Sequence, residues 1–172
     1  MGYFIGYHGT SSVFAEKILR TNFIVDHTKV GWLGTGIYLF EENQELARSW
    51  ANYKYSNSKK GVIRCEIEIA EEEVFDVVDP LGEHNKFFHA VRKQLIEQEI
   101  KKRNLQLRAK NRKDFDGKTY NFICKAKGFK LVRAATYTYQ DYDRIFGWNS
   151  RVPNGVELCV KDINCIKNKQ LV

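Results

Sequence analysis

Proline is scarce in this sequence, and no segment is rich in glycine, serine and proline together. The 172 residues contain only two prolines. This composition argues against a flexible linker, and no repeat with a period of roughly 20 to 50 residues is present. A chain of this length buries roughly two thirds of its unfolded surface as one unit. We therefore expect residues 1–172 to form a single domain.

Long apolar runs are also missing. No uninterrupted apolar stretch approaches the ~18 residues that a membrane span requires. The N-terminus lacks the basic start followed by an apolar run that marks a signal peptide. We expect a cytoplasmic protein that does not contact a membrane.

Cysteine is present at only four scattered positions, and no two cysteines form a C-x-x-C pair. They are Cys65, Cys124, Cys159 and Cys165. A disulfide framework needs denser cysteines in a shorter secreted chain, and no Cys or His pair has the spacing of zinc ligands. We expect four reduced thiols and no metal site.

Positive charge is concentrated in one segment. The net charge is +7, and residues 92–133 alone carry fourteen Lys and Arg against four Asp and Glu. A solvated helix face is one explanation, and a surface that faces a polyanion is the other. For the second case the candidate nucleic-acid-binding residues are Lys101, Lys102, Arg103, Arg108, Lys110, Arg112 and Lys113.

Apolar periodicity indicates both strands and helices. Strands are predicted within residues 3–7, 34–41, 61–70, 74–80, 129–139 and 156–160. Helices are predicted within residues 13–19, 43–53, 85–107 and 118–127, with Ser11 or Ser12 capping the first and Asn43 the second. Two early helices followed by mostly non-adjacent strands favour an α+β fold on an antiparallel or mixed sheet.

Three polar side chains are candidates for a functional site. His8 ends the first predicted strand, Tyr38 follows two glycines, and Glu157 is a lone carboxylate in an alternating strand. Taken singly, these are a structural histidine before a turn, a core tyrosine and a solvent-facing glutamate.

Taken together, they resemble the H-Y-E branch of the ADP-ribosyltransferases, which includes diphtheria toxin and the poly(ADP-ribose) polymerases. The resemblance is carried by "YHGT", "GTGIYLFEENQELA", "GVIRCEIEIAEEEVFDV" and "NGVELCVKD". It implies an ADP-ribosyltransferase-like split β-sheet core with helices packed on it. Residues 84–136 match nothing in the family, so we interpret them as a basic insertion.

The resemblance also implies the roles of individual residues. Glu157, Tyr38 and His8 become the catalytic residues, with Glu157 stabilising the positive charge that develops on ribose as nicotinamide leaves NAD. The implied NAD-binding residues are His8, Gly9, Thr10, Gly36, Tyr38 and Trp50.

Two positions depart from the family pattern. The second stacking tyrosine of the family is replaced by Ser49, and the neighbouring aromatics Trp50 and Tyr53 are its candidate substitutes. Arginine-modifying members carry Glu-x-Glu, but here Gly155 stands two residues before Glu157. Arginine is therefore disfavoured as the acceptor.

The expected function is that of a toxin-like mono-ADP-ribosyltransferase that uses NAD to modify a macromolecule. Nucleic acid is favoured over a protein side chain other than arginine, and a neutralising antitoxin is an implied partner. The aromatic segment 137–150 is either a base-stacking surface or a self-packed lid over NAD. A non-catalytic module of the same fold that binds ADP-ribose or RNA remains the alternative from another class. An RNA 2′-phosphate transferase of related fold is less favoured, because its arginine- and histidine-rich site has no counterpart here.

Overall fold

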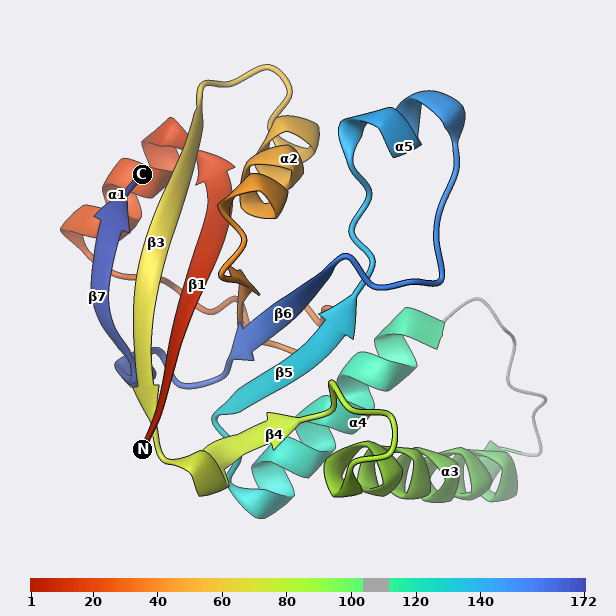
Figure 1. The fold of residues 1–172 in the computed structure, drawn as a ribbon. Coiled ribbons are helices and arrows are strands. Elements are labelled where there is room, and N and C mark those ends of the chain that lie inside the picture. Colours follow the sequence, from red (N-terminus) through yellow and green to blue (C-terminus); the bar gives the residue numbers. More distant parts are fainter. Residues whose placement is uncertain (104–111) are drawn as a thin grey trace.

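The computed structural model describes residues 1–103 and 112–172, and these form one seven-stranded sheet with helices on both faces (Figure 1). The strands are β1 (Gly2–Ser11), β2 (Ile37–Glu41), β3 (Lys60–Ile69), β4 (Val74–Asp76), β5 (Leu131–Thr136), β6 (Gly155–Val160) and β7 (Ile166–Leu171). The α-helices are α1 (Ser12–Arg20), α2 (Gln44–Lys54), α3 (Glu83–Arg103), α4 (Arg112–Lys127) and α5 (Asp141–Phe146). Single 3₁₀ turns lie at Glu71–Glu73 and Ile163–Cys165.

The sheet is mixed, as the sequence predicted. Its order is β4-β5-β6-β2-β1-β3-β7, and every neighbouring pair is antiparallel except β4–β5. In Figure 1 the strands β7, β3 and β1 run steeply, whereas β6, β5 and β4 run obliquely across the molecule. The α+β class is therefore confirmed.

The two halves of the sheet are joined at a short ladder. β1 pairs with β3 along its whole length, from Gly2↔Ile69 to Ser11↔Lys60. It pairs with β2 only at Gly6↔Glu41 and Tyr7↔Phe40. From residue 8 onward, the edge of β1 that faces β2 has no ladder partner in the described residues. The sheet is thus open between β1 and β2.

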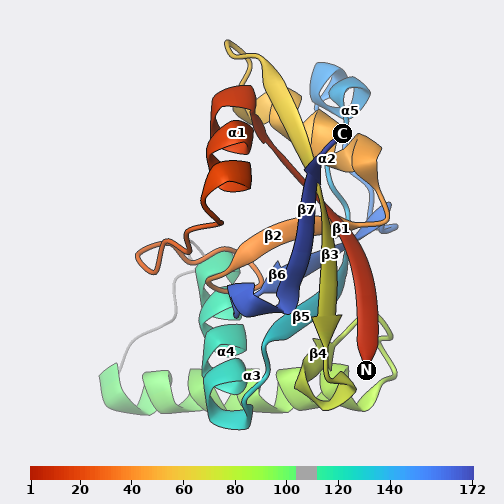
Figure 2. The same ribbon diagram turned by 90° about the vertical axis from the view of Figure 1, so that its left-hand side faces the viewer.

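The helices cover opposite faces of the sheet. Ala15 of α1 packs in the same apolar cluster as Ile63, whereas Leu46 and Ala47 of α2 pack with Val62. Because Val62 and Ile63 are consecutive residues of β3, α1 and α2 lie on opposite faces, as Figure 2 shows. A third cluster packs α3 and α4 on the β4–β5–β6 half.

Local sequence signals account for several helix ends. The side chain of Ser11 accepts a hydrogen bond from the Phe14 N–H at 3.3 Å, and that of Asn43 accepts one from Leu46 at 2.9 Å. Gly128, with φ +78°, ends α4 as predicted. The four cysteines are buried and free, as the sequence indicated. None of the described helices has both the length and the apolarity to cross a membrane.

Several elements differ from the prediction. The first strand is predicted at residues 3–7 but runs from Gly2 to Ser11, because its pairing with β3 continues, so His8 lies inside β1 and not at its end. The strand predicted at 74–80 ends at Asp76, because its side chain accepts the Val78 N–H at 2.9 Å and turns the chain. The edge strand β7 was not predicted, because its sequence is polar and does not alternate clearly between apolar and polar residues. Ile166 is its one buried residue. Within the aromatic segment, the six-residue helix α5 ends at Gly147, which has φ +68°.

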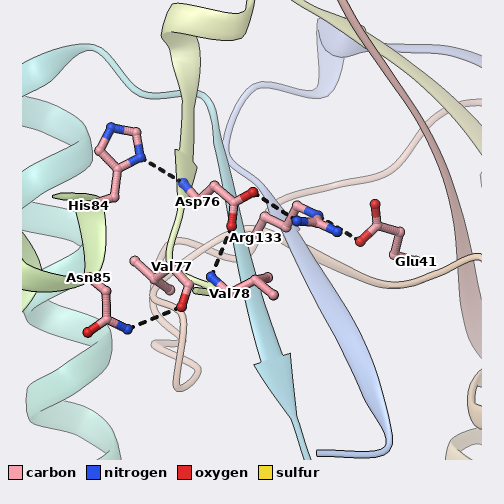
Figure 3. Close-up of polar contacts among 7 residues, drawn as sticks. All are labelled: Glu41, Asp76, Val77, Val78, His84, Asn85 and Arg133. Atoms are coloured by element: carbon pink, nitrogen blue, oxygen red, sulfur yellow. Dashed lines mark hydrogen bonds and ion pairs between the residues drawn. The ribbon is translucent and has the colours of Figure 1, made fainter. Parts of the chain in front are cut away.

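One guanidinium ties three strands together from behind the candidate site. Arg133 of β5 binds Glu41 of β2 and Asp76 of β4, each at 2.8 Å, so that it reaches across β6 (Figure 3). Its neighbour Ala134 is the residue paired with Glu157, so Arg133 lies on the opposite face of the sheet from that carboxylate. These two ion pairs link β2, β4 and β5 around β6, the strand that carries Glu157.

Candidate functional site

A cavity lies where the two halves of the sheet separate. Its volume is about 1070 Å³, and its walls come from β1, β2, β5, β6, α2, α4, the loop at residues 31–32 and the segment around α5. Residues from both ends of the chain meet in it. Those that the sequence singled out and that line it are His8, Gly9, Tyr38, Trp50, Tyr53 and Glu157.

The ring of His8 occupies the opening between β1 and β2. If the ladder continued for two more residues, the carbonyl of Tyr38 would face Gly9. Instead it accepts a hydrogen bond from His8 Nδ1 at 2.8 Å. A carbonyl only accepts, so Nδ1 carries the proton and Nε2 is left as an acceptor. Burial lowers the pKa of His8, which keeps the ring neutral near pH 7.

The backbone of Gly9 faces the same opening. The Ile5 carbonyl accepts the Glu42 N–H at 2.9 Å, so the polar backbone groups of Ile5 point toward β2. Alternate residues of a strand share this direction, which places those of Tyr7 and Gly9 on the same edge. A Cβ at Gly9 would overlap the carbonyl of Ala47 in α2. The glycine is therefore required by helix packing, independently of any ligand.

The hydroxyl of Tyr38 shapes the loop above it. It accepts the Leu33 N–H at 2.9 Å and donates to the Gly34 carbonyl at 2.7 Å. A Cβ at Gly31 would overlap the tyrosine ring, so this glycine allows the loop to lie directly on Tyr38. Burial raises the pKa of Tyr38, and the hydroxyl stays protonated.

Two side chains fix this loop from the other side. Lys161 Nζ donates to the carbonyls of Leu33 and Thr35 at 2.6 and 2.9 Å. Asn121 accepts the Thr35 N–H at 2.8 Å and donates to its hydroxyl at 3.1 Å. The loop that begins at Gly31 is thus held by Tyr38 of β2, by Lys161 directly after β6 and by Asn121 of α4.

Glu157 projects into the cavity and is held by hydrogen-bond donors. Trp32 Nε1 donates to its Oε2 at 2.9 Å, and the Thr138 hydroxyl donates to its Oε1 at 3.3 Å. The carboxyl is buried, with 9% of the residue exposed. Among the described side chains no Lys or Arg forms an ion pair with it. Burial raises its pKa, while the hydrogen bonds from Trp32, Thr136 and Thr138 oppose the shift.

These contacts join the three motif residues into one hydrogen-bonded chain. His8 binds the carbonyl of Tyr38, and the hydroxyl of Tyr38 binds the loop at Leu33 and Gly34. Trp32, the preceding residue of that loop, binds Glu157. The sequence singled out the three residues, and the structure adds the loop that connects them.

Two aromatic residues of α2 line the cavity near Ser49. Trp50 and Tyr53 of α2 both line it, with ring centroids 6.3 Å apart, whereas Ser49 receives a hydrogen bond from Arg144 at 3.4 Å. Trp50 is thus at the cavity as expected, with Tyr53 beside it.

The aromatic segment 137–150 divides between two environments. Tyr137 and Tyr139 face the cavity together with Thr138, as the lid interpretation requires. Phe146 and Trp148 stack on each other at 5.0 Å and are 63% and 69% exposed, as an outer docking surface requires. Each of the two interpretations fits one part of the segment.

Two predicted cofactor-binding residues do not line the cavity. Thr10 is 2% exposed and lies in the interior beyond Gly9. Gly36 packs against β6, where a Cβ would stand 2.6 Å from the Val160 carbonyl oxygen. Close strand packing accounts for this glycine.

Lys101 is the one predicted basic residue whose side chain the structure describes, and it does not line the cavity. Lys101 is exposed near the end of α3. Arg108 and Lys110 lie outside the described residues. Lys102, Arg103, Arg112 and Lys113 fall at the ends of α3 and α4, where only the backbone is described.

Sequence reasoning missed the residues that hold Glu157. Trp32 is 125 positions away from it and lies in a loop without periodicity, so no local pattern connects the two. The one sequence feature that could have indicated Trp32 is its position two residues before Gly34. Thr138 and Arg144 lie in the segment 137–150, which was interpreted only from its aromatic residues.

Comparison with known proteins adds little to this site. Neither a family model nor a solved structure matches the chain. Over 77 residues it is 35% identical to an uncharacterized protein of Methanocaldococcus jannaschii. This stretch is 41% of the chain and 36% of the relative, so the chain spans about a third of the relative's length.

Proposed function

We propose that the protein is an NAD-dependent mono-ADP-ribosyltransferase with an ADP-ribosyltransferase-like split sheet. The observation that supports this most is the convergence of His8, Tyr38, Trp50 and Glu157 on one cavity. These residues were named from three separated motifs, and the fold brings them together at the opening between β1 and β2. A chance resemblance in three motifs would not require that meeting.

The cavity suits a dinucleotide. Its volume of about 1070 Å³ lies just above the range of roughly 300 to 1,000 Å³ that is usual for small-molecule and cofactor sites. Its aromatic walls offer stacking surfaces for flat rings, and Trp50 contributes one of them. The backbone edge of Gly9 offers a donor and an acceptor, which match a carboxamide such as that of nicotinamide.

The chain would contribute electrostatics and positioning to the reaction. NAD supplies an activated glycosidic bond, whose two electrons leave with nicotinamide as the acceptor's lone pair bonds to the ribose carbon. Glu157 lies in a buried wall, where a carboxylate stabilises positive charge developing on the sugar. The same carboxylate accepts the proton that the acceptor loses. His8, with Nε2 as an acceptor, suits a ribose hydroxyl.

Nucleic acid is the acceptor that charge favours. The chain carries +7, and the surplus is concentrated in residues 92–133. Exposed lysines of α4, Lys118, Lys125 and Lys127, belong to this segment within the described residues. Such a density of cations suits phosphates, and the exposed Phe146 and Trp148 suit unpaired bases.

A protein acceptor is the second candidate, and one surface favours it. Ile145 and Val152 belong to the same connection between β5 and β6 as Phe146 and Trp148, and they are 77% and 72% exposed. A group of exposed apolar side chains resembles the centre of a protein interface, which is more apolar and less charged than the rest of a protein surface. An antitoxin that covers this surface would also fit, in keeping with the toxin-like character that the resemblance implies.

Labelled NAD distinguishes these possibilities. The purified protein is incubated with NAD labelled in its adenylate part and with separate pools of RNA, DNA and protein. We expect the label to be retained by a nucleic-acid pool. Retention by protein selects the second candidate. Absence of both transfer and nicotinamide release in every pool would refute the proposed activity.

A further inference from the structure

The cavity is bordered by three carboxylates and one guanidinium. Glu157, Asp116 and Asp143 line it, and Arg144 is the one Lys or Arg side chain among the described lining residues. Asp116 is ion-paired with Arg92, so its charge is offset within the protein. A diphosphate brings further negative charge, and within this wall only the neighbourhood of Arg144 offers a permanent cation to offset it.

The side chain of Arg144 is already oriented for such a contact. Its guanidinium lies 4.3 Å from the centre of the Tyr53 ring in α2, and 21% of the side chain is exposed. Its hydrogen bond to Ser49 and its ion pair with the exposed Asp141 are both 3.4 Å long and both start from Nη1. These bonds are weak, and neither uses Nε or Nη2. A stacked guanidinium with unused N–H groups loses little freedom when it binds an anion.

We propose that Arg144 binds the diphosphate of the dinucleotide, an assignment that rests on the proposed function. It gives the ligand a direction in the cavity. The ribose whose bond breaks lies at Glu157, and the phosphates lie where α5 meets α2. In Figure 1 these two helices stand side by side, and Arg144 is the residue that joins them.

Binding and cleavage together test the assignment. ADP-ribose affinity is measured by calorimetry for the wild type, Arg144→Gln and Arg144→Lys. Arg151→Gln is the control, because it removes an equal charge from an exposed residue of the same connection that does not line the cavity. The same variants are then assayed for hydrolysis of NAD and of nicotinamide riboside, which has the same glycosidic bond but no phosphate.

We expect Arg144→Gln to weaken ADP-ribose binding about 10- to 100-fold and to raise the KM for NAD similarly, as loss of a hydrogen bond to a charged group does. Arg144→Lys should recover part of the loss, and Arg151→Gln should match the wild type. Hydrolysis of nicotinamide riboside should stay within about twofold, whereas a purely structural clamp would lower it as well.

Different failures have different meanings. Wild-type affinity in Arg144→Gln, or an equal loss with nicotinamide riboside, overturns the assignment of Arg144 and leaves the transferase proposal standing. A wild type that binds ADP-ribose through Arg144 but never cleaves NAD refutes the transferase activity alone. A wild type that binds neither ADP-ribose nor NAD overturns both.

Discussion

Replacing Glu157 by Gln removes one charge from the cavity and retains the shape of the side chain. The amide oxygen of Gln can accept the Trp32 N–H that now reaches Oε2, and its amide nitrogen can donate to the Thr138 hydroxyl. A carboxylate ~4 Å from a developing positive charge is worth ~4 kcal/mol at an effective dielectric constant of 20. We therefore expect NAD cleavage to slow by about a thousandfold, with NAD affinity retained.

The same substitution should stabilise the fold at neutral pH. Burial raises the pKa of Glu157 above its unfolded value, so the folded protein holds this proton over a pH window in which the unfolded chain has lost it. In that window the free energy of unfolding of the wild type falls as pH rises, by about 1.4 kcal/mol for each unit of pKa elevation. Gln does not titrate, so its advantage should appear above the window and vanish below it.

Two measurements on one protein pair test the reasoning. Nicotinamide release is followed with saturating NAD, and urea unfolding is compared at several pH values from about 4 to 8. A Gln variant that turns over at the wild-type rate would show that Glu157 is not catalytic. A variant that loses both activity and stability at every pH would show that the carboxylate is structural.

Three further changes separate scaffold from chemistry. Trp32→Phe removes a hydrogen-bond donor to Glu157, so the pKa of Glu157 should rise further. The acidic limb of the pH profile of NAD cleavage should shift to higher pH, and the rate should fall about tenfold. An unchanged pH profile would contradict the role of Trp32. Tyr38→Phe leaves the Leu33 N–H and the Gly34 carbonyl without their partner. The free energy of unfolding, measured in urea, should fall by about 1–3 kcal/mol, while the ring still binds NAD. A fully stable variant without turnover would show that the hydroxyl is catalytic instead. Neutralising the basic residues 101–103 should weaken nucleic-acid binding and reduce its salt slope by about one unit per lost phosphate contact, without affecting NAD hydrolysis; loss of hydrolysis would place these charges in the active site.

Much of the fold was predictable because its signals are local. The alternation of Ile63, Cys65, Ile67 and Ile69 identified β3, and all four are buried. Caps such as Asn43 act within three residues, so they can be read without knowledge of the rest of the chain. The edge strand β7 lacked such a signal, because most of its side chains face solvent.

Only part of the site could be predicted, because many of its contacts join residues that are far apart in the sequence. The resemblance supplied His8, Tyr38 and Glu157 as residue types in order along the chain. It could not supply Trp32, Lys161 or Arg144, because their roles depend on which loops the fold brings together. Lys161 is 128 positions from the Leu33 carbonyl that it binds. A polar residue in a loop carries no periodicity from which such a contact can be inferred.

The hydrogen-bonded chain from His8 to Glu157 explains why the three motif residues belong together physically. His8 caps the Tyr38 carbonyl that the interrupted ladder leaves without a backbone partner, and so stabilises the opening between β1 and β2. The hydroxyl of Tyr38 then sets the loop, and the loop places the indole of Trp32 against the carboxylate. A change at either end of this chain alters the support of the other. The residues that open the cavity are therefore also those that hold its carboxylate in place.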